Sequence, residues 1–339
     1  MSKKVFITGG AGYIGSVTNR FLKDQGYDTV IFDSMELGHD WACLPAGKAI
    51  SGTKLIQGNL TDKAAIKSAL EAEHPDAVIH FGSYIQMGES YQNPGKYYRN
   101  NILGALNLLE SMVELKLNHL VFSSSAGVYG SPDTVPIPET APKLPENPYG
   151  QNKLDIENML HWFDLAHGLT HIALRYFNAC GAAPDWSLGE AHEPESHIIP
   201  IFINRALGGE SLTINGQDYH TPDHTCVRDY VHVLDLASAH KLALEALLTG
   251  ADSNVYNIGT GRGFSNLEIA REILQATGSS LPINYGPRRP GDADSLVADS
   301  SKIQAELGWK PVHSSLENII STALAWHKSR LNPLTKPRL

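Results

Sequence analysis

A tyrosine and a lysine stand four residues apart in the segment NPYGQNK, at positions 149 and 153, directly after Pro148. On an α-helix, positions i and i+4 lie one above the other on the same face. Pro148 suits the first turn of such a helix, because its missing N–H would have no partner there. The five-residue pattern alone favours a partly buried tyrosine beside a solvated lysine. The alternative is a phenol whose proton the ammonium makes easier to remove.

A glycine-rich turn near the N-terminus points to a nucleotide. In FITGGAGYIGS, Gly9, Gly12 and Gly15 follow a strand-like run and open a helix-like one. Such glycines let the backbone approach a pyrophosphate, which then sits on the helix N-terminus. Asp33 ends the next strand-like run, where a carboxylate can hydrogen-bond the adenosine ribose and repel a 2′-phosphate. The glycines alone leave a plain connecting turn equally open, but strand, helix and acid together predict NAD binding.

Three serines complete a candidate reaction centre. Ser123, Ser124 and Ser125 stand at the end of a further strand-like run. A side chain at the carboxyl end of a sheet strand points into the ligand crevice. Hydride transfer from an alcohol needs a base for the hydroxyl proton, and tyrosine in water titrates near ~10. We therefore expect Lys153 and a positive nicotinamide to lower the pKa of Tyr149, while one of the serines holds the alcohol.

Alternating strands and helices are expected to position these residues. Short β-branched runs predict strands at 4–8, 29–33, 54–58, 77–81, 119–124 and 171–177. Helix-like stretches lie between most of them, at 13–25, 62–73 with Thr61 as N-cap, 94–116 and after Pro148. Such alternation is typical of right-handed βαβ units. The sequence therefore predicts an α/β fold with a Rossmann-type doubly wound parallel sheet.

The second half of the chain has a looser pattern. Residues 181–197 are polar and rich in Gly and Pro, which predicts a long loop. Helices are expected near 199–208, at 235–248, after Ser265 and twice near the end, with strands near 212–214, 229–233 and 254–259 and a loop at 286–295. We expect residues 1–178 to form an NAD-binding domain. Residues 179–339 should form mainly a smaller C-terminal α/β substrate domain, with segments near 226–260 returning to the first sheet.

Composition excludes several classes of protein. The 339 residues are 42% hydrophobic and 19% charged, which is ordinary for a globular chain with a buried core. A formal net charge of -9 argues against a nucleic-acid surface. Cys43, Cys180 and Cys226 are far apart and odd in number, so they indicate reduced thiols in the cytoplasm rather than disulfides or a zinc site. No apolar run predicts a signal peptide or a membrane span.

Ten stretches, in order, resemble one known family and cover nearly the whole chain. The chain is similar to the UDP-glucose 4-epimerases among the extended short-chain dehydrogenase/reductases, particularly the bacterial form with a compact loop after the second strand. The stretches are TGGAGYIGS, MGESYQNP, YYRNNILGALNLL, FSSSAGVYG, PYGQNK, LRYFNACGA, GEAHEPESHIIP, TPDHTCVRDYVHVLDLA, YNIGTGRGFSNLEI and RRPGDADSLVADSSK. The resemblance implies oxidation of a UDP-sugar at C4 by tightly held NAD+, rotation of the keto sugar, and return of hydride to its opposite face.

The resemblance also implies roles for individual residues. Tyr149 would take the sugar 4-hydroxyl proton, Lys153 would tune it and bind the nicotinamide ribose, and Ser125 would hydrogen-bond the substrate hydroxyl. The other implied cofactor positions are Gly9, Gly12, Tyr13, Ile14, Gly15, Asp33, Asn59, Leu60, Phe81, Asn100, Ser123 and Phe177. The implied positions around the UDP moiety are Asn178, His197, Ile198, Asn215, Arg228, Arg289 and Asp292. Members of the family usually form homodimers through two long helices, here 94–116 and 149–167, and no metal is implied.

Several positions depart from the family pattern. Asn59 replaces an aspartate near the adenine, and Ile85 stands where one branch carries a lysine. His197 replaces an asparagine, as in the compact-loop branch, and Asn215 replaces an aromatic near the uracil. Leu296 matches a position that limits the size of the sugar pocket. Leucine is intermediate there, so the admission of N-acetylated sugars stays open.

Other activities on the same fold are alternatives. The substrate could instead be UDP-xylose or UDP-arabinose, UDP-GlcNAc, or UDP-glucuronate, although a carboxylated sugar would call for an extra cation. A nucleotide-sugar dehydratase would need an adjacent Asp-Glu pair where this chain has Ala126 and Gly127. A non-catalytic NAD-binding protein would not need Tyr149 and Lys153. An ordinary dehydrogenase would show net reduction of the cofactor.

Overall fold

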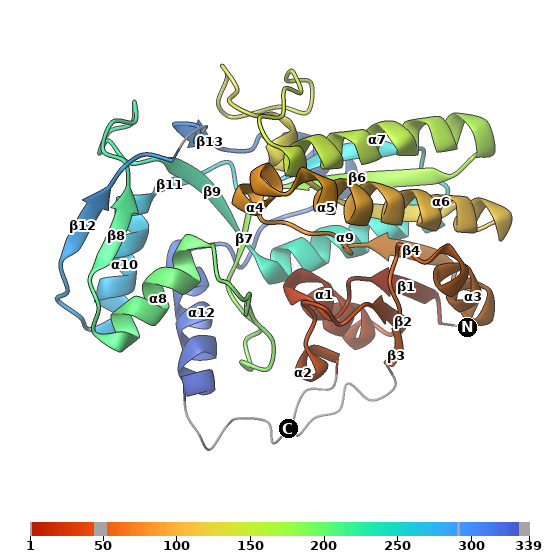
Figure 1. The fold of residues 1–339 in the computed structure, drawn as a ribbon, viewed down its shortest axis with the longest axis horizontal. Helices are drawn as coiled ribbons and strands as arrows, with labels where there is room; N and C mark the ends of the chain where they lie inside the picture. Colours follow the sequence, from red (N-terminus) through yellow and green to blue (C-terminus); the bar gives the residue numbers. More distant parts are fainter. Residues whose placement is uncertain (1, 44–52, 290–291, 332–339) are drawn as a thin grey trace.

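Seven parallel strands form the central sheet of the computed structural model, which describes residues 2–43, 53–289 and 292–331 (Figure 1). In chain order they are β1 (Lys4–Thr8), β2 (Asp28–Asp33), β3 (Lys54–Gln57), β4 (Ala77–His80), β5 (His119–Ser125), β6 (Thr170–Tyr176) and β10 (Asn254–Ile258). Their order across the sheet is β10-β6-β5-β4-β1-β2-β3. Most of these strands are β-branched runs with few exposed residues, as expected for a parallel sheet that is covered on both faces. The Rossmann-type α/β prediction is confirmed.

Helices cover both faces of this sheet. One face packs against α3 (Lys63–Glu73), α6 (Gly104–Glu114) and α7 (Pro148–His167), and Ile66, Leu108 and Ile156 lie in the shared core. The other face packs against α1 (Tyr13–Asp24), α9 (Val233–Leu248) and α11 (Ser301–Leu307), with Leu22 and Leu236 buried among the strands. Each fully buried aliphatic side chain of this kind contributes about 1.5–3 kcal/mol to folding. The two cores therefore hold the carboxyl edge of the sheet rigid.

The strand order changes direction between β1 and β4. From β1 the chain proceeds outward through β2 and β3, and it then returns to β4 and proceeds the other way. Thr8 Oγ1 and His80 Nδ1 lie 2.7 Å apart at the ends of these two strands. Directly beyond them, the backbones of Gly9 and Gly82 approach so closely that a Cβ on Gly9 would meet the Gly82 nitrogen at 2.6 Å. In open parallel sheets the ligand crevice opens at such a switch point.

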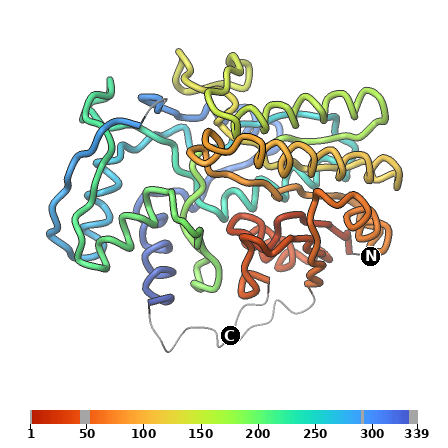
Figure 2. The backbone as a smooth tube through the Cα atoms, in the orientation of Figure 1, coloured from red at the N-terminus to blue at the C-terminus, as the bar shows by residue number. Residues whose placement is uncertain are grey.

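A second lobe follows β6. Its main sheet has the order β11 (Gly263–Ser265), β9 (Val227–His232) and β13 (Ser295–Leu296), with β7 (Asn178–Cys180) also paired to β9. A separate pair joins β8 (Leu212–Asn215) to β12 (Ile283–Gly286). Helices α8 (Ile198–Gly208), α10 (Asn266–Thr277) and α12 (Leu316–Leu331) enclose one apolar core with these strands. Figure 2 shows the green segment after β7 passing between the two lobes.

The shorter elements lie near the crevice. They are α2 (Asp40–Cys43), α4 (Met87–Gln92), α5 (Pro94–Tyr97), the π-helical turn η1 (Tyr98–Leu103) and the 3₁₀ turn η2 (Ala126–Val128). The stretch predicted as one helix at 94–116 is therefore α5, η1 and α6 in succession. Within the described part of the chain, none of the helices has both the length and the apolar character needed to span a membrane.

Two local predictions about helix caps can be compared with the structure. Ser265 caps α10 as expected, in a reciprocal capping box with Glu268. The prediction that Thr61 caps α3 is wrong, because the Asp62 side chain accepts the bond from the Ala65 N–H. Thr61 instead donates its hydroxyl and its N–H to the Asn59 side chain. Because Thr61 bonds to Asn59, it does not cap the helix, and α3 starts one residue later than predicted.

Candidate active site

The glycine turn joins β1 to α1, and its three glycines meet different surroundings. Gly9 has φ +70, and a Cβ on Gly15 would lie 2.3 Å from the Gly9 carbonyl oxygen, so the chain's own packing requires both. A Cβ on Gly12 would make only an ordinary contact of 3.5 Å with that oxygen. Gly12 is the N-cap of α1, without a side-chain cap. The turn therefore leaves room and unpaired backbone donors for an anionic group at the helix N-terminus.

Asp33 closes β2 beside this turn and is 9% exposed. Its Oδ2 accepts a hydrogen bond from the Ala11 N–H at 2.9 Å, and its Oδ1 accepts one from the Met35 N–H at 2.9 Å. Burial raises the pKa of Asp33, while these two backbone bonds act in the opposite direction. The carboxylate is thereby fixed at the edge of the turn, in the position that suits recognition of a ribose. The turn and the acid together fit a dinucleotide.

Tyr149 and Lys153 lie in the first turns of α7, as their spacing predicts. The Asn147 side chain caps this helix by accepting a bond from the Gly150 N–H at 2.8 Å, and Pro148 occupies its first turn. Lys153 is only 1% exposed, so the solvated lysine of the simpler interpretation is wrong. Its Nζ donates to the Ser123 carbonyl oxygen at 2.7 Å and to the Ser83 hydroxyl oxygen at 3.0 Å.

The three serines at the end of β5 have different partners. Ser124 Oγ donates to Glu157 Oε1 at 2.5 Å, and this carboxylate is also paired with Arg175 at 2.6 Å. Ser124 therefore belongs to a buried structural network. Ser125 Oγ accepts a bond from the Gly127 N–H at 3.1 Å and lies at the end of the strand. Of the three, Ser125 has the side chain beside the Tyr149 phenol.

The electrostatics of the pair differ from the prediction. Burial raises the pKa of Tyr149, and the hydrogen bond with Ser125 opposes this shift. Burial also lowers the pKa of Lys153 to about 7, against the raising effect of Glu157. Lys153 Nζ lies 5.8 Å from the centroid of the Tyr149 ring. The protein's own residues therefore keep the phenol protonated, because desolvation opposes both charged forms.

The other residues that the resemblance marks for a cofactor come from the same edge of the sheet and its flanking turns. Tyr13 and Ile14 open α1, and the Tyr13 hydroxyl donates to the Gly181 carbonyl oxygen at 2.6 Å. Phe81 follows β4 and packs on His240, with 4.7 Å between ring centroids. The rest are Asn59 and the buried Leu60 after β3, Ser123 in β5, Asn100 in η1, and the buried Phe177 after β6.

The residues marked for the UDP moiety gather in the second lobe. Arg228 in β9 forms a short ion pair with Asp292, which also accepts a bond from the Tyr219 hydroxyl at 2.8 Å. With its amide oxygen turned toward Arg289, Asn215 accepts bonds from Nε at 3.0 Å and Nη2 at 3.2 Å. A cleft of about 630 Å³ runs beside Asp292, and its lining includes Ser131, Asp133, Glu146, Arg288 and Asp294.

Three further marked residues lie where the second lobe joins the first. Asn178 begins β7 directly after β6. His197 is the N-cap of α8, and Ile198 is the first residue of that helix. The structure thus places the marked residues in two groups, one at the sheet edge and one in the second lobe. Asn59 is an exposed residue after β3, and its side chain contacts Thr61 rather than Tyr149.

Sequence reasoning missed several residues that the structure places at the site. Ser83 contacts Lys153, and Tyr219 holds Asp292. The sequence around Ser83 and Tyr219 contains no pattern that predicts these contacts. Glu157 raises the pKa of Lys153 and follows it at the i+4 position of α7, a spacing that could have identified it. Glu190 lies in the long loop that joins the two lobes.

Comparisons with known proteins agree with this geometry. The model of the NAD dependent epimerase/dehydratase family matches residues 5–259. A UDP-glucose 4-epimerase of Lactobacillus helveticus is 46% identical over 327 residues, which cover 96% of this chain and 97% of the relative. The structure of UDP-glucose 4-epimerase from Brucella ovis in complex with NAD has a TM-score of 0.90 and 42% identity, and covers 96% of this chain and 98% of that one. The enzyme from Bifidobacterium longum in complex with NAD+ and UDP has a TM-score of 0.90 and 35% identity, and covers 98% and 100%. The chain therefore belongs to the NAD dependent epimerase/dehydratase family, and the three similar proteins named here are UDP-glucose 4-epimerases.

Proposed function

We propose that this chain is an NAD-dependent isomerase that interconverts UDP-glucose and UDP-galactose. The observation that carries the proposal is the cluster of Ser125, Tyr149 and Lys153 at the carboxyl edge of the sheet, beside the glycine turn. An alcohol oxidation needs a proton acceptor and a group that holds the hydroxyl, and this cluster contains both. The similar proteins named above are UDP-glucose 4-epimerases, enzymes that act at C4 of the sugar.

The residues of the chain divide the work between proton transfer and orientation. Tyr149 takes the proton of the sugar 4-hydroxyl, and it returns a proton to the same oxygen when the sugar has turned over. Ser125 orients that hydroxyl through its Oγ. Lys153, held by Ser83 and the Ser123 carbonyl, supports the phenolate with its charge. Bound NAD would accept hydride from C4 and return it, and its positive nicotinamide would favour the ionised form of Tyr149.

The second lobe holds the nucleotide part of the substrate. Arg228 and Arg289 supply charge-assisted hydrogen bonds to phosphate, which guanidinium groups make in pairs. Asp292 orients Arg228, and Asn215 orients Arg289. Asn178, His197 and Ile198 border the sugar and the diphosphate. Anchoring through the diphosphate lets the sugar ring turn while the nucleotide stays in place.

The test uses purified protein with UDP-galactose and no added NAD, and a coupled UDP-glucose dehydrogenase step reports UDP-glucose. Tyr149→Phe should lower kcat by about 10²–10⁴-fold, because it removes the proton acceptor. Tyr27→Phe is the matched control, since Tyr27 lies at the amino end of β2 and its hydroxyl meets Glu245. Failure of the wild-type protein to form product, even with NAD supplied, would rule out this activity.

We also propose the organisation of the chain around this site. Residues 1–178 bind mainly NAD, and residues 179–339 bind mainly the UDP-sugar, with β10 completing the first sheet. The three cysteines are buried free thiols, which suits a reducing cytoplasm.

A homodimer is proposed through the two long helical segments. Apolar side chains remain exposed on η1 and α7, namely Tyr98 at 43%, Leu103 at 40%, Trp162 at 64% and Leu165 at 67%. Apolar surface of this kind is what a subunit interface covers. Light scattering after size exclusion should give twice the chain mass of 36.9 kDa, and a monomer at micromolar concentration would refute the dimer.

A further inference from the structure

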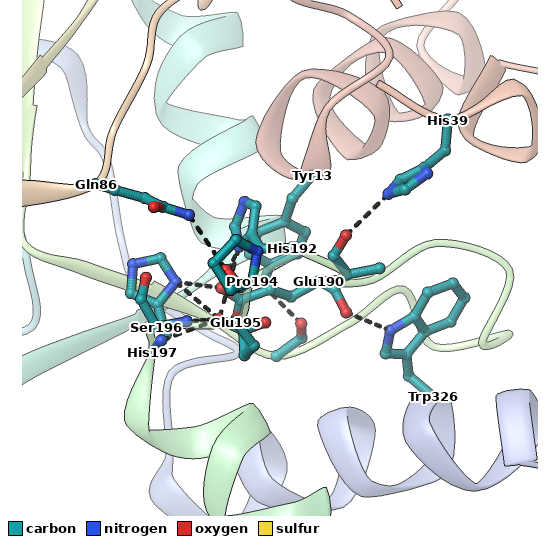
Figure 3. Close-up of polar contacts among 12 residues, drawn as sticks. Tyr13, His39, Gln86, Glu190, His192, Pro194, Glu195, Ser196, His197 and Trp326 are labelled. Atoms are coloured by element: carbon teal, nitrogen blue, oxygen red, sulfur yellow. Dashed lines mark hydrogen bonds and ion pairs between the residues drawn. The ribbon is translucent and has the colours of Figure 1, made fainter. Parts of the chain in front are cut away.

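Four charged or titratable side chains converge in the loop between β7 and α8 (Figure 3). Glu190, His192, Glu195 and His197 each place a ligand-type atom within 4.8 Å of the others. Glu190 is 5% exposed, and its Oε1 accepts hydrogen bonds from His192 Nδ1 at 3.1 Å and from His197 Nδ1. Glu195 Oε1 lies 3.8 Å and 3.7 Å from the same two nitrogens. One buried carboxylate thus holds two imidazoles.

The pKa shifts in this cluster favour charged histidines beside Glu190. Burial alone would raise the pKa of Glu190, but ion pairing with His197 and His192 lowers it to about 2. Burial lowers the pKa of His192, yet its bonds with Glu190 and Glu195 raise it to about 10. The pKa of His197 is also raised, chiefly by Glu190 against the effect of burial. These shifts favour imidazolium forms of both histidines beside the Glu190 carboxylate, so protons supply positive charge to this donor set without a metal.

Hydrogen bonds from both lobes hold the loop, and they fix the position of the cluster. The Gln86 amide donates to the Pro194 carbonyl oxygen at 3.2 Å, and Trp326 Nε1 donates to the Glu190 carbonyl oxygen at 2.8 Å. A ring nitrogen of His39 lies 2.8 Å from the Ala191 carbonyl oxygen. Figure 3 shows these contacts converging on the loop from α12 and from the first lobe. A loop held at several points can present one side chain in one orientation.

The other titratable groups that face the cluster do not change its charge at neutral pH. Tyr13 on α1 stands edge-on to His192, with 6.5 Å between ring centroids, and burial together with Glu190 raises its pKa well above the ordinary value. Burial lowers the pKa of His327 on α12, against the effect of Glu190 and Glu195. Arg330 on the same helix interacts with the loop through Glu193. Tyr13 and His327 are therefore neutral, and Glu190 is the main partner of His197.

His197 stands at the start of α8, an eleven-residue helix. Its side chain makes no capping bond, and the first turn carries no acidic residue and contains Pro200. The positive end of a helix dipole favours an anion, and an imidazolium beside it adds a full charge. Glu190 occupies Nδ1 of His197, so Nε2–H is the remaining donor on a side chain that is 43% exposed.

We propose that Glu190 is a positioning residue that holds His197 as an oriented, cationic donor for the diphosphate of the UDP-sugar. The proposal rests on the proposed function, because it assigns the diphosphate to the start of α8. Glu190 touches neither sugar nor phosphate and acts only through the imidazole. His192 contacts the same carboxylate oxygen of Glu190 as His197 does.

The test measures UDP affinity by calorimetry and KM for UDP-galactose from pH 6 to pH 8. In Glu190→Gln, the pKa of His197 should fall, because burial lowers it and its main ion-pair partner is gone. UDP affinity at pH 8 should then be about tenfold weaker, and should recover toward the wild-type value at pH 6, because one charge-assisted bond is lost and regained. The wild-type values should change less with pH over this range than those of the variant, and kcat should change less than KM. Glu193→Gln, an exposed carboxyl in the same loop, is the matched control.

Several results would overturn the proposal. One is a loss of UDP affinity in Glu190→Gln that is the same at pH 6 and pH 8, since a purely structural role has that signature. Another is a stoichiometric divalent metal in the purified protein that Glu190→Gln removes. If Glu190→Gln does not fold, His197→Gln decides, and it should bind UDP weakly at every pH. Wild-type UDP affinity that falls with a midpoint near pH 6.5 also contradicts the proposal. Calorimetry measures UDP binding even if the protein does not convert UDP-galactose. A failure of the proposed Glu190 role can therefore be distinguished from a failure of the proposed activity.

Discussion

Replacing Lys153 with methionine should stabilise the fold at low pH while it removes activity. The ammonium is 1% exposed, and burial lowers its pKa to about 7 despite the nearby Glu157 carboxylate. Holding this cation in the folded chain therefore costs free energy that a neutral side chain of similar length does not. The lysine is retained because the proposed reaction needs a charge beside Tyr149.

The size and sign of the effect follow from this pKa. A shift from 10.5 to about 7 corresponds to roughly 5 kcal/mol, at about 1.36 kcal/mol per pH unit. The penalty is fully present below pH 7, where folded and unfolded lysine are both protonated. Between pH 7 and 10.5 only the unfolded lysine binds the proton, so wild-type stability rises with pH. The variant also loses the hydrogen bonds of Lys153 to Ser83 and Ser123, which reduces its gain in stability by about 1–3 kcal/mol at every pH.

The measurement is urea unfolding of wild type and Lys153→Met at pH 6, 7.5 and 9. We expect the variant to be about 2–4 kcal/mol more stable at pH 6, and this advantage to shrink by about 2.5 kcal/mol at pH 9. The difference in unfolding free energy between the two proteins removes the pH dependence of groups that the substitution does not affect. Lys67→Met, at a partly exposed lysine on α3 that pairs with Glu114, controls for loss of a surface charge. An advantage that is constant to within about 0.5 kcal/mol from pH 6 to pH 9 would refute a buried lysine with a lowered pKa.

Two further pairs of variants separate site from scaffold. Gly15→Ala should fail to fold or lose much stability, because its Cβ would meet the Gly9 carbonyl oxygen at 2.3 Å. Gly12→Ala should keep the melting temperature of the NAD-free protein and lose bound NAD. Cofactor absorbance after extraction, together with thermal unfolding, distinguishes the two, and equal NAD retention in Gly12→Ala would contradict the assignment. Ser125→Ala should lower kcat by about 10²-fold. Ser124→Ala should keep most activity and lose about 1–3 kcal/mol of stability, as a buried carboxylate loses a donor; the reverse pattern in assays of kcat and unfolding would exchange their roles.

The sequence was sufficient for the architecture of the first lobe because its strands and helices have strong, separate patterns. The runs at 4–8 and 77–81 are apolar and bounded by turns, and the structure places them as adjacent parallel strands. NPYGQNK predicted the start of α7 from its proline and its i+4 pair. The strands at 263–265 and 295–296 were not predicted, since strands of three and two residues carry no period. Residues 290–291 of the predicted loop at 286–295 lie outside the described residues.

The candidate site was less accessible to sequence reasoning, because its chemistry depends on burial. The Tyr149 and Lys153 spacing gave their proximity, but it did not show that burial in the protein alone raises the pKa of Tyr149. Nothing in the residue types distinguishes Ser124 from Ser125, whereas the contact of Ser124 with Glu157 and the position of Ser125 beside Tyr149 do so. The loop at 181–197 was expected to be long and polar, yet its pattern did not reveal that Glu190 would be buried.

The position of β10 has a consequence for how the protein is made. β6 pairs with β5 on one side and with β10 on the other, where Ile172 lies opposite Asn254. On the ribosome, α8, β8 and β9 all emerge before the strand that covers β6 exists. Until then the nascent chain carries an open parallel edge, the kind of surface that recruits other chains or chaperones. A fragment that ends near residue 178 would have a sheet with that edge bare, so we expect the first lobe alone to associate with other chains.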